Sequence, residues 1–201
     1  MSRKLVLASS NAGKLAELRP LLAGAGFELL PQGELGVGDI EETGLSFVEN
    51  ALLKARHASA GTGLPALADD SGLVVPALGG APGLYSARYA GPHGDSAANI
   101  EKLLGELAGR PDADRRAYFH CTLVLLRHER DPQPLVAEGS WHGRILEVRC
   151  GEGGFGYDPV FLPDGHAQSV AELAPALKHR ISHRGQALAA LRARLAGARP
   201  C

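Results

Sequence analysis

The sequence predicts a mixed α/β fold, and three observations support this. Short apolar runs such as 4–8 alternate with stretches of helical spacing such as 14–26 in the first half of the chain. Two long β-rich runs, 117–128 and 134–148, are separated only by a short polar break, which is typical of an antiparallel hairpin. A further helix is expected at the end, over 182–197. We therefore expect α/β architecture with antiparallel strands in the second half.

The composition predicts one globular domain. The chain has 201 residues, 45% of them apolar and 21% charged. Residues 1–201 are therefore expected to form a single domain with one substantial core, which can be split into two lobes. No window approaches the roughly 18 apolar residues of a membrane span, and the first residues are too briefly apolar for a signal peptide. A net charge of −1 gives no general attraction for nucleic acid.

Cysteine usage predicts a reducing compartment. The three cysteines, Cys121, Cys150 and Cys201, are an odd number and show no C-x-x-C spacing. This argues against a disulfide framework or a zinc site. We expect a cytoplasmic protein.

The first elements follow from simple patterns. The apolar run 4–8 predicts a strand, and leucines at helical spacing predict a helix over 14–26 that ends at its glycines. Pro20 inside this helix predicts a kink or an early stop. A second strand is expected at 27–30, followed by an acidic, glycine-rich loop over 31–44.

The helix predicted over 46–61 has the clearest signals. Ser46 and Glu49 match a capping box, good helix formers follow, and Gly61 is expected to close the helix. The stretch 65–78 then predicts two strand pieces on either side of an aspartate pair, because strands are depleted in Asp.

The remaining elements complete the prediction. A helix over 96–109 would be capped by Asp95 or Ser96. After the hairpin, a glycine-dense loop over 149–163 leads into a short strand, and Ser182 is a candidate cap for the terminal helix.

The stretch SSNAGK after the first strand could bind a phosphate. Hydroxyls, free backbone N–H groups, an electropositive helix end and a lysine are what a phosphate needs, although an ordinary capped turn looks similar. It is not a Walker A motif. The residues concerned are Ser9, Ser10, Asn11, Ala12, Gly13 and Lys14.

Two acidic pairs could hold a metal. Glu41-Glu42 lies in the loop before the capped helix, and Asp69-Asp70 interrupts an apolar run. Carboxylates from separate segments are suited to Mg²⁺, which takes oxygen ligands and leaves positions for substrate phosphates. For the glutamates a solvated loop is the stronger alternative. The aspartates, which have apolar residues on both sides, are less easily explained as a plain turn.

A polar stripe follows on the capped helix. Asn50, Lys54 and His57 lie at i, i+4 and i+7, beside a predicted core face that includes Ala51 and Ala55. Such a stripe most often faces solvent.

Two later stretches could recognise a base. In GGFGYDP the glycines allow close approach, Phe155 offers a stacking surface and Asp158 an acceptor, although aromatic residues there could equally fill the core. The segment 177–186 holds the densest positive cluster, with Lys178, His183 and Arg184 among its members. It is either a solvated basic turn or a donor set for an anion or a planar base.

Together these motifs resemble one family. SSNAGK, EETGLSFVENALLKA, ADDSGL, LGGAPGLYSARY, FHC, GGFGYDPVF and SHRGQAL occur in this order, from Leu5 to about Leu195. This series closely resembles the inosine triphosphate pyrophosphatase family. The resemblance implies a long mixed sheet flanked by helices, with two lobes around a central substrate cleft. It also implies an Mg²⁺-dependent homodimer that cleaves dITP, ITP and XTP or dXTP to the monophosphate and pyrophosphate.

The resemblance also implies residue roles. Glu41 and Asp70 would bind Mg²⁺, and Asp70 would accept the proton of the attacking water. Asp69 would support the site from behind or bind a second metal. The remaining residues implied to contact the substrate are Ser9, Ser10, Asn11, Ala12, Gly13, Lys14, Lys54, Ser71, Phe155, Gly156, Tyr157, Asp158, Lys178, His183 and Arg184.

Base selection follows from hydrogen-bond chemistry. Donors from His183 and Arg184 would satisfy the 6-oxo group of hypoxanthine or xanthine and would meet the 6-amino group of adenine donor to donor. Two other functions remain open: a related pyrophosphatase acting on pyrimidine or modified nucleotides, and a nucleotide sensor without turnover. The series departs from the family at Pro175, where relatives usually carry acidic or polar residues.

Overall fold

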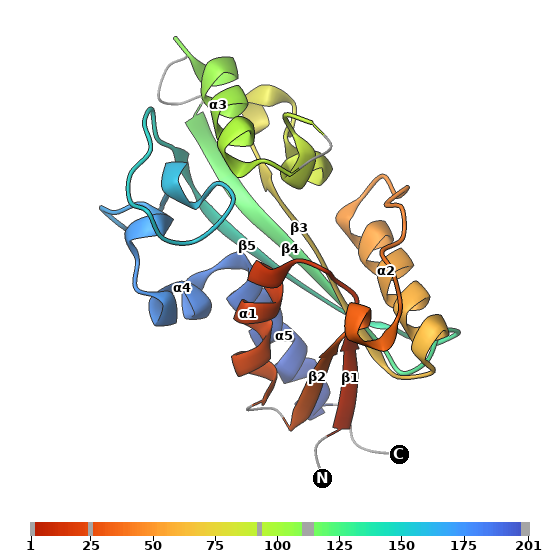
Figure 1. Ribbon diagram of the computed structural model, residues 1–201. Helices are drawn as coiled ribbons and strands as arrows, with labels where there is room; N and C mark the ends of the chain where they lie inside the picture. Colours follow the sequence, from red (N-terminus) through yellow and green to blue (C-terminus); the bar gives the residue numbers. More distant parts are fainter. Residues whose placement is uncertain (1–2, 24–25, 92–93, 110–114, 198–201) are drawn as a thin grey trace. The chain divides into compact units, whose positions relative to one another are not determined.

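The computed structural model describes residues 3–23, 26–91, 94–109 and 115–197 (Figure 1). Cys201 and the side chain of Ala12 lie outside the described residues. The strands form one sheet in the order β2-β1-β3-β4-β5-β6. Their bounds are β1 (Arg3–Leu7), β2 (Phe27–Pro31), β3 (Ala66–Val74), β4 (Arg116–Leu126), β5 (Leu135–Ile145) and β6 (Phe161–Pro163).

The sheet is mixed, which confirms the predicted fold class. Strand β1 pairs in parallel with β2 and β3, whereas β5 and β6 are antiparallel. Strands β4 and β5 are neighbours joined by only a short loop, so they must be antiparallel, since a parallel pair needs a long crossover. The helices are α1 (Ala12–Ala23), α2 (Phe47–Thr62), α3 (Ser96–Leu107), α4 (Pro175–Ile181) and α5 (His183–Gly197).

The chain divides into two compact units. The first unit comprises Met1–Asp70, Cys121–Gly139 and Ala187–Cys201, and the second comprises Ser71–His120 and Ser140–Gln186. Strands β3, β4 and β5 and helix α5 each pass from one unit into the other. The single domain with a central cleft stays a prediction.

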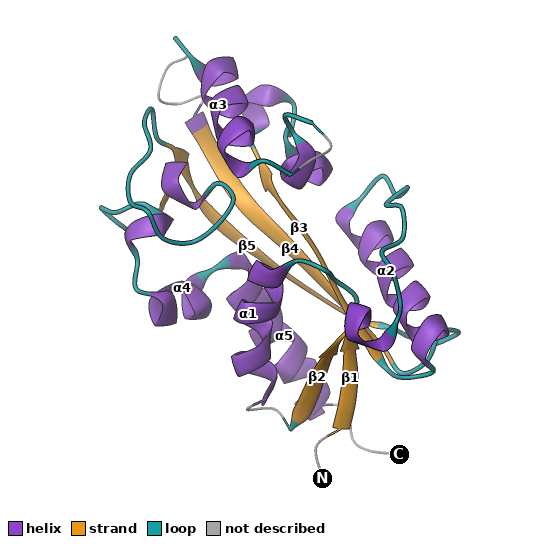
Figure 2. Cartoon of the chain, viewed as in Figure 1, coloured by secondary structure: helices purple, strands orange, loops and turns teal. Residues whose placement is uncertain are grey.

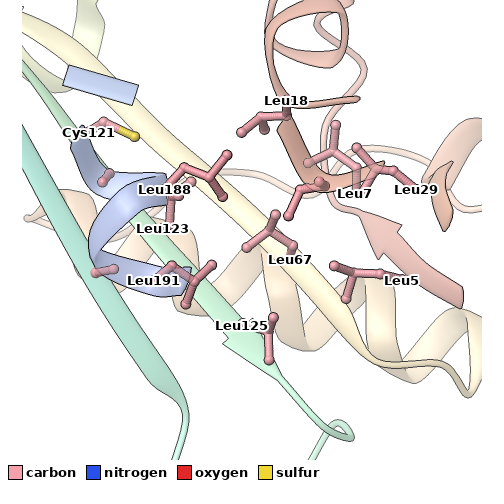
Figure 3. Close-up of a cluster of buried hydrophobic side chains, with 13 residues drawn as sticks. Leu5, Leu7, Leu18, Leu29, Leu67, Cys121, Leu123, Leu125, Leu188 and Leu191 are labelled. Carbon is pink, nitrogen blue, oxygen red and sulfur yellow. The ribbon is translucent and has the colours of Figure 1, made fainter. Parts of the chain in front are cut away.

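The first unit has helices on both faces of its strands (Figure 2). Side chains alternate along β1, so Leu5 and Leu7 pack on the face covered by α1 and α5, and Val6 packs on the face covered by α2. Figure 3 shows the leucine-rich cluster on the face that contains Leu5 and Leu7. On the other face α2 presents Ala51, Ala55 and Ala58, small residues that let the helix lie close to the sheet.

The second unit has an aromatic core. Helix α3 buries a stripe that includes Ile100, Leu103 and Leu107, at helical spacing. Strands β4, β5 and β6 supply aromatic rings to the same cluster, namely Phe119, Trp141 and Phe161. Asp95 caps α3 by accepting from two backbone N–H groups, so the first of the two predicted caps is confirmed.

Two sequence predictions at helix ends are wrong, and the departure at Pro175 has a structural explanation. Helix α1 continues through Pro20 to Ala23, so the early stop is wrong. Helix α2 closes at Gly63 rather than Gly61, because Gly63 has the left-handed φ of 68° that a helix end requires. Pro175, where the sequence departs from the family pattern, occupies the first turn of α4, where proline's missing N–H is not needed.

The prediction of two strand pieces around the aspartates is also wrong. Strand β3 runs unbroken from Ala66 to Val74 with both Asp69 and Asp70 buried in it. The described helices include none that is long and apolar enough to span a membrane.

A buried carboxylate organises the β4–β5 loop in the first unit. Both oxygens of Asp131 accept from Arg127, through its backbone N–H and its guanidinium, and one also accepts from the Gln133 N–H. These bonds hold the pKa of Asp131 well below its usual range. Arg56 of α2 donates to the carbonyls of Glu129 and Asp131, which ties α2 to the loop.

We expect Asp131→Asn to lower the free energy of unfolding by about 2–3 kcal/mol at pH 7, because charge-assisted bonds to a buried acceptor are lost. The pKa of Asp131 is lower in the folded state, so its stabilisation is complete above about pH 4 and is lost as the pH falls further. The difference between variant and wild type should therefore shrink at pH 3. Urea unfolding at both pH values measures it, with exposed Asp164→Asn as control, and an equal difference at both would contradict the prediction.

Candidate functional site

The predicted phosphate stretch forms the start of α1. Strand β1 ends at Leu7, and Asn11 caps the helix by accepting from the Lys14 N–H through its side-chain oxygen, at 3.0 Å. The Ser9 hydroxyl accepts from the Asn11 N–H at 3.2 Å. Asn11 is exposed and Gly13 half-buried. The residues thus lie at an electropositive helix N-terminus, the setting in which a phosphate is bound.

Ser10 joins this stretch to the acidic loop. Its hydroxyl donates to a carboxylate oxygen of Asp39 at 2.6 Å, and the other oxygen of Asp39 accepts from the Gln32 amide at 2.7 Å. His57 of α2 contacts the carbonyl of Gly38 at 2.9 Å. The loop that carries Glu41 and Glu42 is therefore held in place on its N-terminal side.

Asp69 is fully buried and paired with Lys14. The Lys14 ammonium lies 2.8 Å from one carboxylate oxygen of Asp69 and 3.1 Å from its carbonyl oxygen. The second carboxylate oxygen accepts from the Cys121 thiol of β4 at 3.4 Å. Both carboxylate oxygens thus have a partner within the unit, which fits a supporting residue better than a second metal ligand.

Lys54 forms ion pairs with two neighbouring carboxylates. Its ammonium lies 2.5 Å from Asp70, 2.8 Å from Glu42 and 3.0 Å from the Asp69 carbonyl. The expectation of a solvent-facing stripe is therefore wrong for Lys54. It is wrong as well for Asn50, which is buried and accepts from the Gly44 N–H at 2.8 Å.

Burial and neighbouring charges shift the pKa values of Lys54 and Asp70 in opposite directions. Burial would lower the pKa of Lys54, but the carboxylates of Asp70 and Glu42 outweigh it and raise the pKa. Burial raises the pKa of Asp70, against the opposing effect of Lys54. The pKa of Lys54 thus favours the cation, and the raised pKa of Asp70 makes it a stronger base than a free aspartate.

The oxygen donors suit a hard cation. Asp70 and Glu42 both present carboxylate oxygens at Lys54, and Mg²⁺ is typically held by one or two carboxylates plus substrate phosphates. Glu41, the predicted second ligand, is exposed on the same loop and stays a prediction. Within the described ranges no group of three or more His, Cys, Asp or Glu side chains forms a ready metal cage.

In the second unit, the SHRG motif forms the start of α5. Ser182 caps the helix, with its hydroxyl accepting from the Gly185 N–H at 3.2 Å. A Cβ on Gly185 would lie 2.1 Å from the carbonyl oxygen of His179, so only glycine lets α5 start this close to the end of α4. Arg184 is buried and donates to the Ser71 hydroxyl at 3.1 Å.

The GGFGYDP loop is closed by a buried ion pair. One oxygen of Asp158 accepts from the Phe155 N–H at 2.8 Å and from the Lys178 ammonium at 2.6 Å. A Cβ on Gly154 would lie 2.1 Å from the same oxygen. Lys178 also lies 4.5 Å from the centre of the Phe155 ring, which remains 39% exposed. Phe155 is therefore held as a partly open stacking surface.

Gly156 and Tyr157, which lie between Phe155 and Asp158, differ in role. Gly156 takes a φ of 61°, which permits the turn. Tyr157 is buried, and its hydroxyl donates to the Ser86 carbonyl at 2.9 Å. Burial raises the pKa of Tyr157. Its side chain fills the core, as the alternative interpretation of this loop predicted, and the substrate contacts of Gly156, Tyr157 and Asp158 stay predictions.

His183 is the first residue of α5 and is buried. Its imidazole stacks on the ring of Phe119, with centroids 4.9 Å apart and planes 13° from parallel. Phe119 in turn meets Phe161 edge to face at 4.8 Å. A flat surface from β4 thus supports the residue expected to select the base.

The sequence alone assigns no role to three residues that make the contacts described above. Asp39 has no signal beyond an acidic loop, whereas Glu42 is expected only as one member of an acidic pair that could hold a metal. The other two lie in the FHC motif on β4, where Phe119 contacts His183 and Cys121 contacts Asp69. Successive residues of a strand point to opposite faces, so residues 119 and 121 are expected on one face of β4, but only the contacts identify their partners.

Comparison with known proteins places the chain among close relatives. The model of the Ham1 family matches residues 5–194, which confirms the resemblance. A dITP/XTP pyrophosphatase of Xanthomonas oryzae pv. oryzae is 61% identical over 96% of this chain and 97% of that protein. One of Methylococcus capsulatus is 58% identical over 97% of each chain.

Solved structures give the same result. A HAM1 protein from Coxiella burnetii matches with a TM-score of 0.90 and 51% identity, over 98% of this chain and 100% of that one. A nucleoside-triphosphatase, also titled dITP/XTP pyrophosphatase, from Mycobacterium abscessus matches with a TM-score of 0.74 and 46% identity, over 94% and 97%.

We expect Asp69→Asn to lower the free energy of unfolding by about 3 kcal/mol, because Lys14 would keep its charge while losing the buried counter-charge. Chemical unfolding followed by circular dichroism measures this. The matched control is the double variant Lys14→Met with Asp69→Asn, which removes both charges and should recover part of the loss. A double variant that loses the sum of the two single effects would show that the pair does not matter.

Proposed function

Because the chain belongs to the Ham1 family, we propose that it hydrolyses nonstandard purine nucleoside triphosphates. The substrates are dITP, ITP and XTP or dXTP, and the products are the nucleoside monophosphate and pyrophosphate. This activity would remove such nucleotides before they enter DNA or RNA. The observation that carries the proposal is the cluster on β3, where the Asp69 carbonyl accepts from both Lys14 and Lys54, and Asp70 pairs with Lys54.

In this proposal the first unit binds the triphosphate. The N-terminus of α1 offers N–H groups and hydroxyls, and Lys14 and Lys54 supply two cations beside the acceptor Asp70. These cations neutralise charge that develops on the leaving pyrophosphate. Asp70 orients a water toward the α-phosphorus and accepts its proton, a role supported by its raised pKa.

Mg²⁺ is part of the proposal, held by Asp70 with Glu41 or Glu42. When bound, it would neutralise phosphate charge and polarise the P–O bonds of the substrate. The support is the chemistry of the donors. Asp70 and Glu42 both lie beside Lys54, and their carboxylate oxygens are of the kind that Mg²⁺ binds together with phosphate oxygens.

The second unit would bind the base. Phe155 offers a partly exposed ring for stacking, and His183 and Arg184 offer donors for a 6-oxo group. Adenine presents a donor at this position, and leaving buried polar groups unpaired costs about 1–3 kcal/mol for each. Selection against adenine is thus a matter of mismatched donors.

The setting of the enzyme completes the proposal. We propose a homodimer in the cytoplasm, on the strength of the family resemblance and of the cysteine usage respectively. Neither a nucleic acid nor a membrane is a proposed partner, in keeping with the near-zero net charge.

A substrate panel tests the selectivity. With Mg²⁺ present, pyrophosphate release from dITP and XTP should exceed that from ATP by at least about a hundredfold, since two unmatched contacts suffice for this. dGTP, whose base also carries a 6-oxo group, is assayed alongside. Chelation of the metal with EDTA should abolish release, and added Mg²⁺ should restore it. Comparable rates on all four nucleotides would contradict the proposed substrate class.

Replacing the proposed base tests the chemistry. Asp70→Asn should lower kcat for dITP by about two to four orders of magnitude, because the proton acceptor is lost. Glu34→Gln, an exposed change on the 3-10 turn Gln32–Leu35, is the control and should keep wild-type turnover. Near-normal turnover of Asp70→Asn would rule out the assignment.

A further inference from the structure

We propose that Phe119 is a positioning residue for base selectivity, because it fixes the plane of the His183 ring. This inference rests on the proposed function, in which His183 donates a hydrogen bond to the base. Phe119 acts through His183 and is not itself placed against the substrate. Its role follows from stacking, burial and the packing behind it.

The backbone of His183 is fixed by α5, but its ring is not. Ser182 and Gly185 hold the first turn of the helix in place. The χ2 angle of histidine has a broad preference, so a fixed backbone does not set the direction of the ring N–H groups. A second contact is needed for that.

Phe119 supplies this contact. Its ring lies 4.9 Å from the His183 ring and within 13° of parallel, so rotation of the imidazole about χ2 would drive its edge into the phenyl face. Phe119 itself is held edge to face by Phe161, which meets Trp141 at 5.7 Å. Phe161 is fully buried. The direct contact with the buried Phe161 therefore holds the Phe119 ring in place.

Orientation matters for selectivity because hydrogen bonds are directional. An N–H donor prefers an angle above 150° at the hydrogen and weakens steeply below about 120°. A loosened His183 ring would donate less well to the 6-oxo group of hypoxanthine, and could turn its donor away from the 6-amino group of adenine. Loss of the flat support should thus reduce the preference for dITP over dATP, not only the overall rate.

The first test replaces the flat ring with a branched chain. Phe119→Leu should lower kcat/KM for dITP about tenfold, mainly through KM, and should lower the dITP-to-dATP preference about tenfold. Phe119→Tyr keeps the flat face and should retain the preference. Trp141→Leu is the matched control, since Trp141 belongs to the same aromatic cluster and contacts Phe161. An equal loss of preference in Phe119→Leu and Trp141→Leu would overturn the inference.

The second test reads the stacking directly. A proton above an aromatic face is shifted upfield by the ring current, so the His183 ring carbon-bound protons should resonate upfield in the NMR spectrum of the histidine-labelled full chain. The shift should be lost in Phe119→Leu and kept in Trp141→Leu, with His183→Asn providing the assignment. If Phe119→Leu does not fold, Phe119→Met fills the site without a flat face and takes its place.

The two proposals fail in different ways. If wild-type protein releases no pyrophosphate from dITP, the proposed function fails before any variant is made. If wild-type activity and selectivity are as expected, but the ring-current shift is absent or Phe119→Leu keeps the full preference, the role of Phe119 is refuted and the proposed function stands.

Discussion

Two buried carboxylates in the middle of β3 determine how helices α1 and α2 of the first unit contact this strand. A carboxylate without a partner in the protein interior costs several kcal/mol, so Asp69 and Asp70 require cations. Helix α1 brings Lys14 to Asp69, and α2 brings Lys54 to Asp70. Because each lysine also donates to the Asp69 carbonyl, the two helices meet the strand at one point. The groups proposed to act on phosphate are therefore the same groups that stabilise the strand.

The second unit follows a related pattern with a different outcome. Its buried ion pair, Asp158 with Lys178, closes a glycine-rich loop instead of a strand. The pair leaves Phe155 partly exposed above the Lys178 ammonium, while Tyr157 fills the core beside it. Charge pairing thus decides which aromatic ring of the loop faces outward and which faces inward. The first unit uses ion pairs to place charged groups, and the second uses one to present a flat apolar surface.

Local sequence signals predicted most elements but not the long-range contacts. The capping box at Ser46 and the alternation of apolar residues placed α2, β1 and the β4–β5 pair, since these features act within a few residues. The unbroken β3 was missed because the partner of Asp69 lies 55 residues away on α1. The choice between Gly61 and Gly63 depends on backbone dihedral angles that composition does not reveal. The contact of Phe119 with His183 joins residues far apart in the chain, so no local pattern predicts it.

The boundaries between the units lie inside regular elements: after residue 70 in β3, after 120 in β4, after 139 in β5 and after 186 in α5. Neither unit is a continuous stretch of chain. No gene fragment encodes one unit alone, and no single proteolytic cut releases one. A single crossover would therefore exchange parts of both units together. If the second unit recognises the base as proposed, a change of base preference is reached more readily by substitutions within the intact framework than by exchange of that unit.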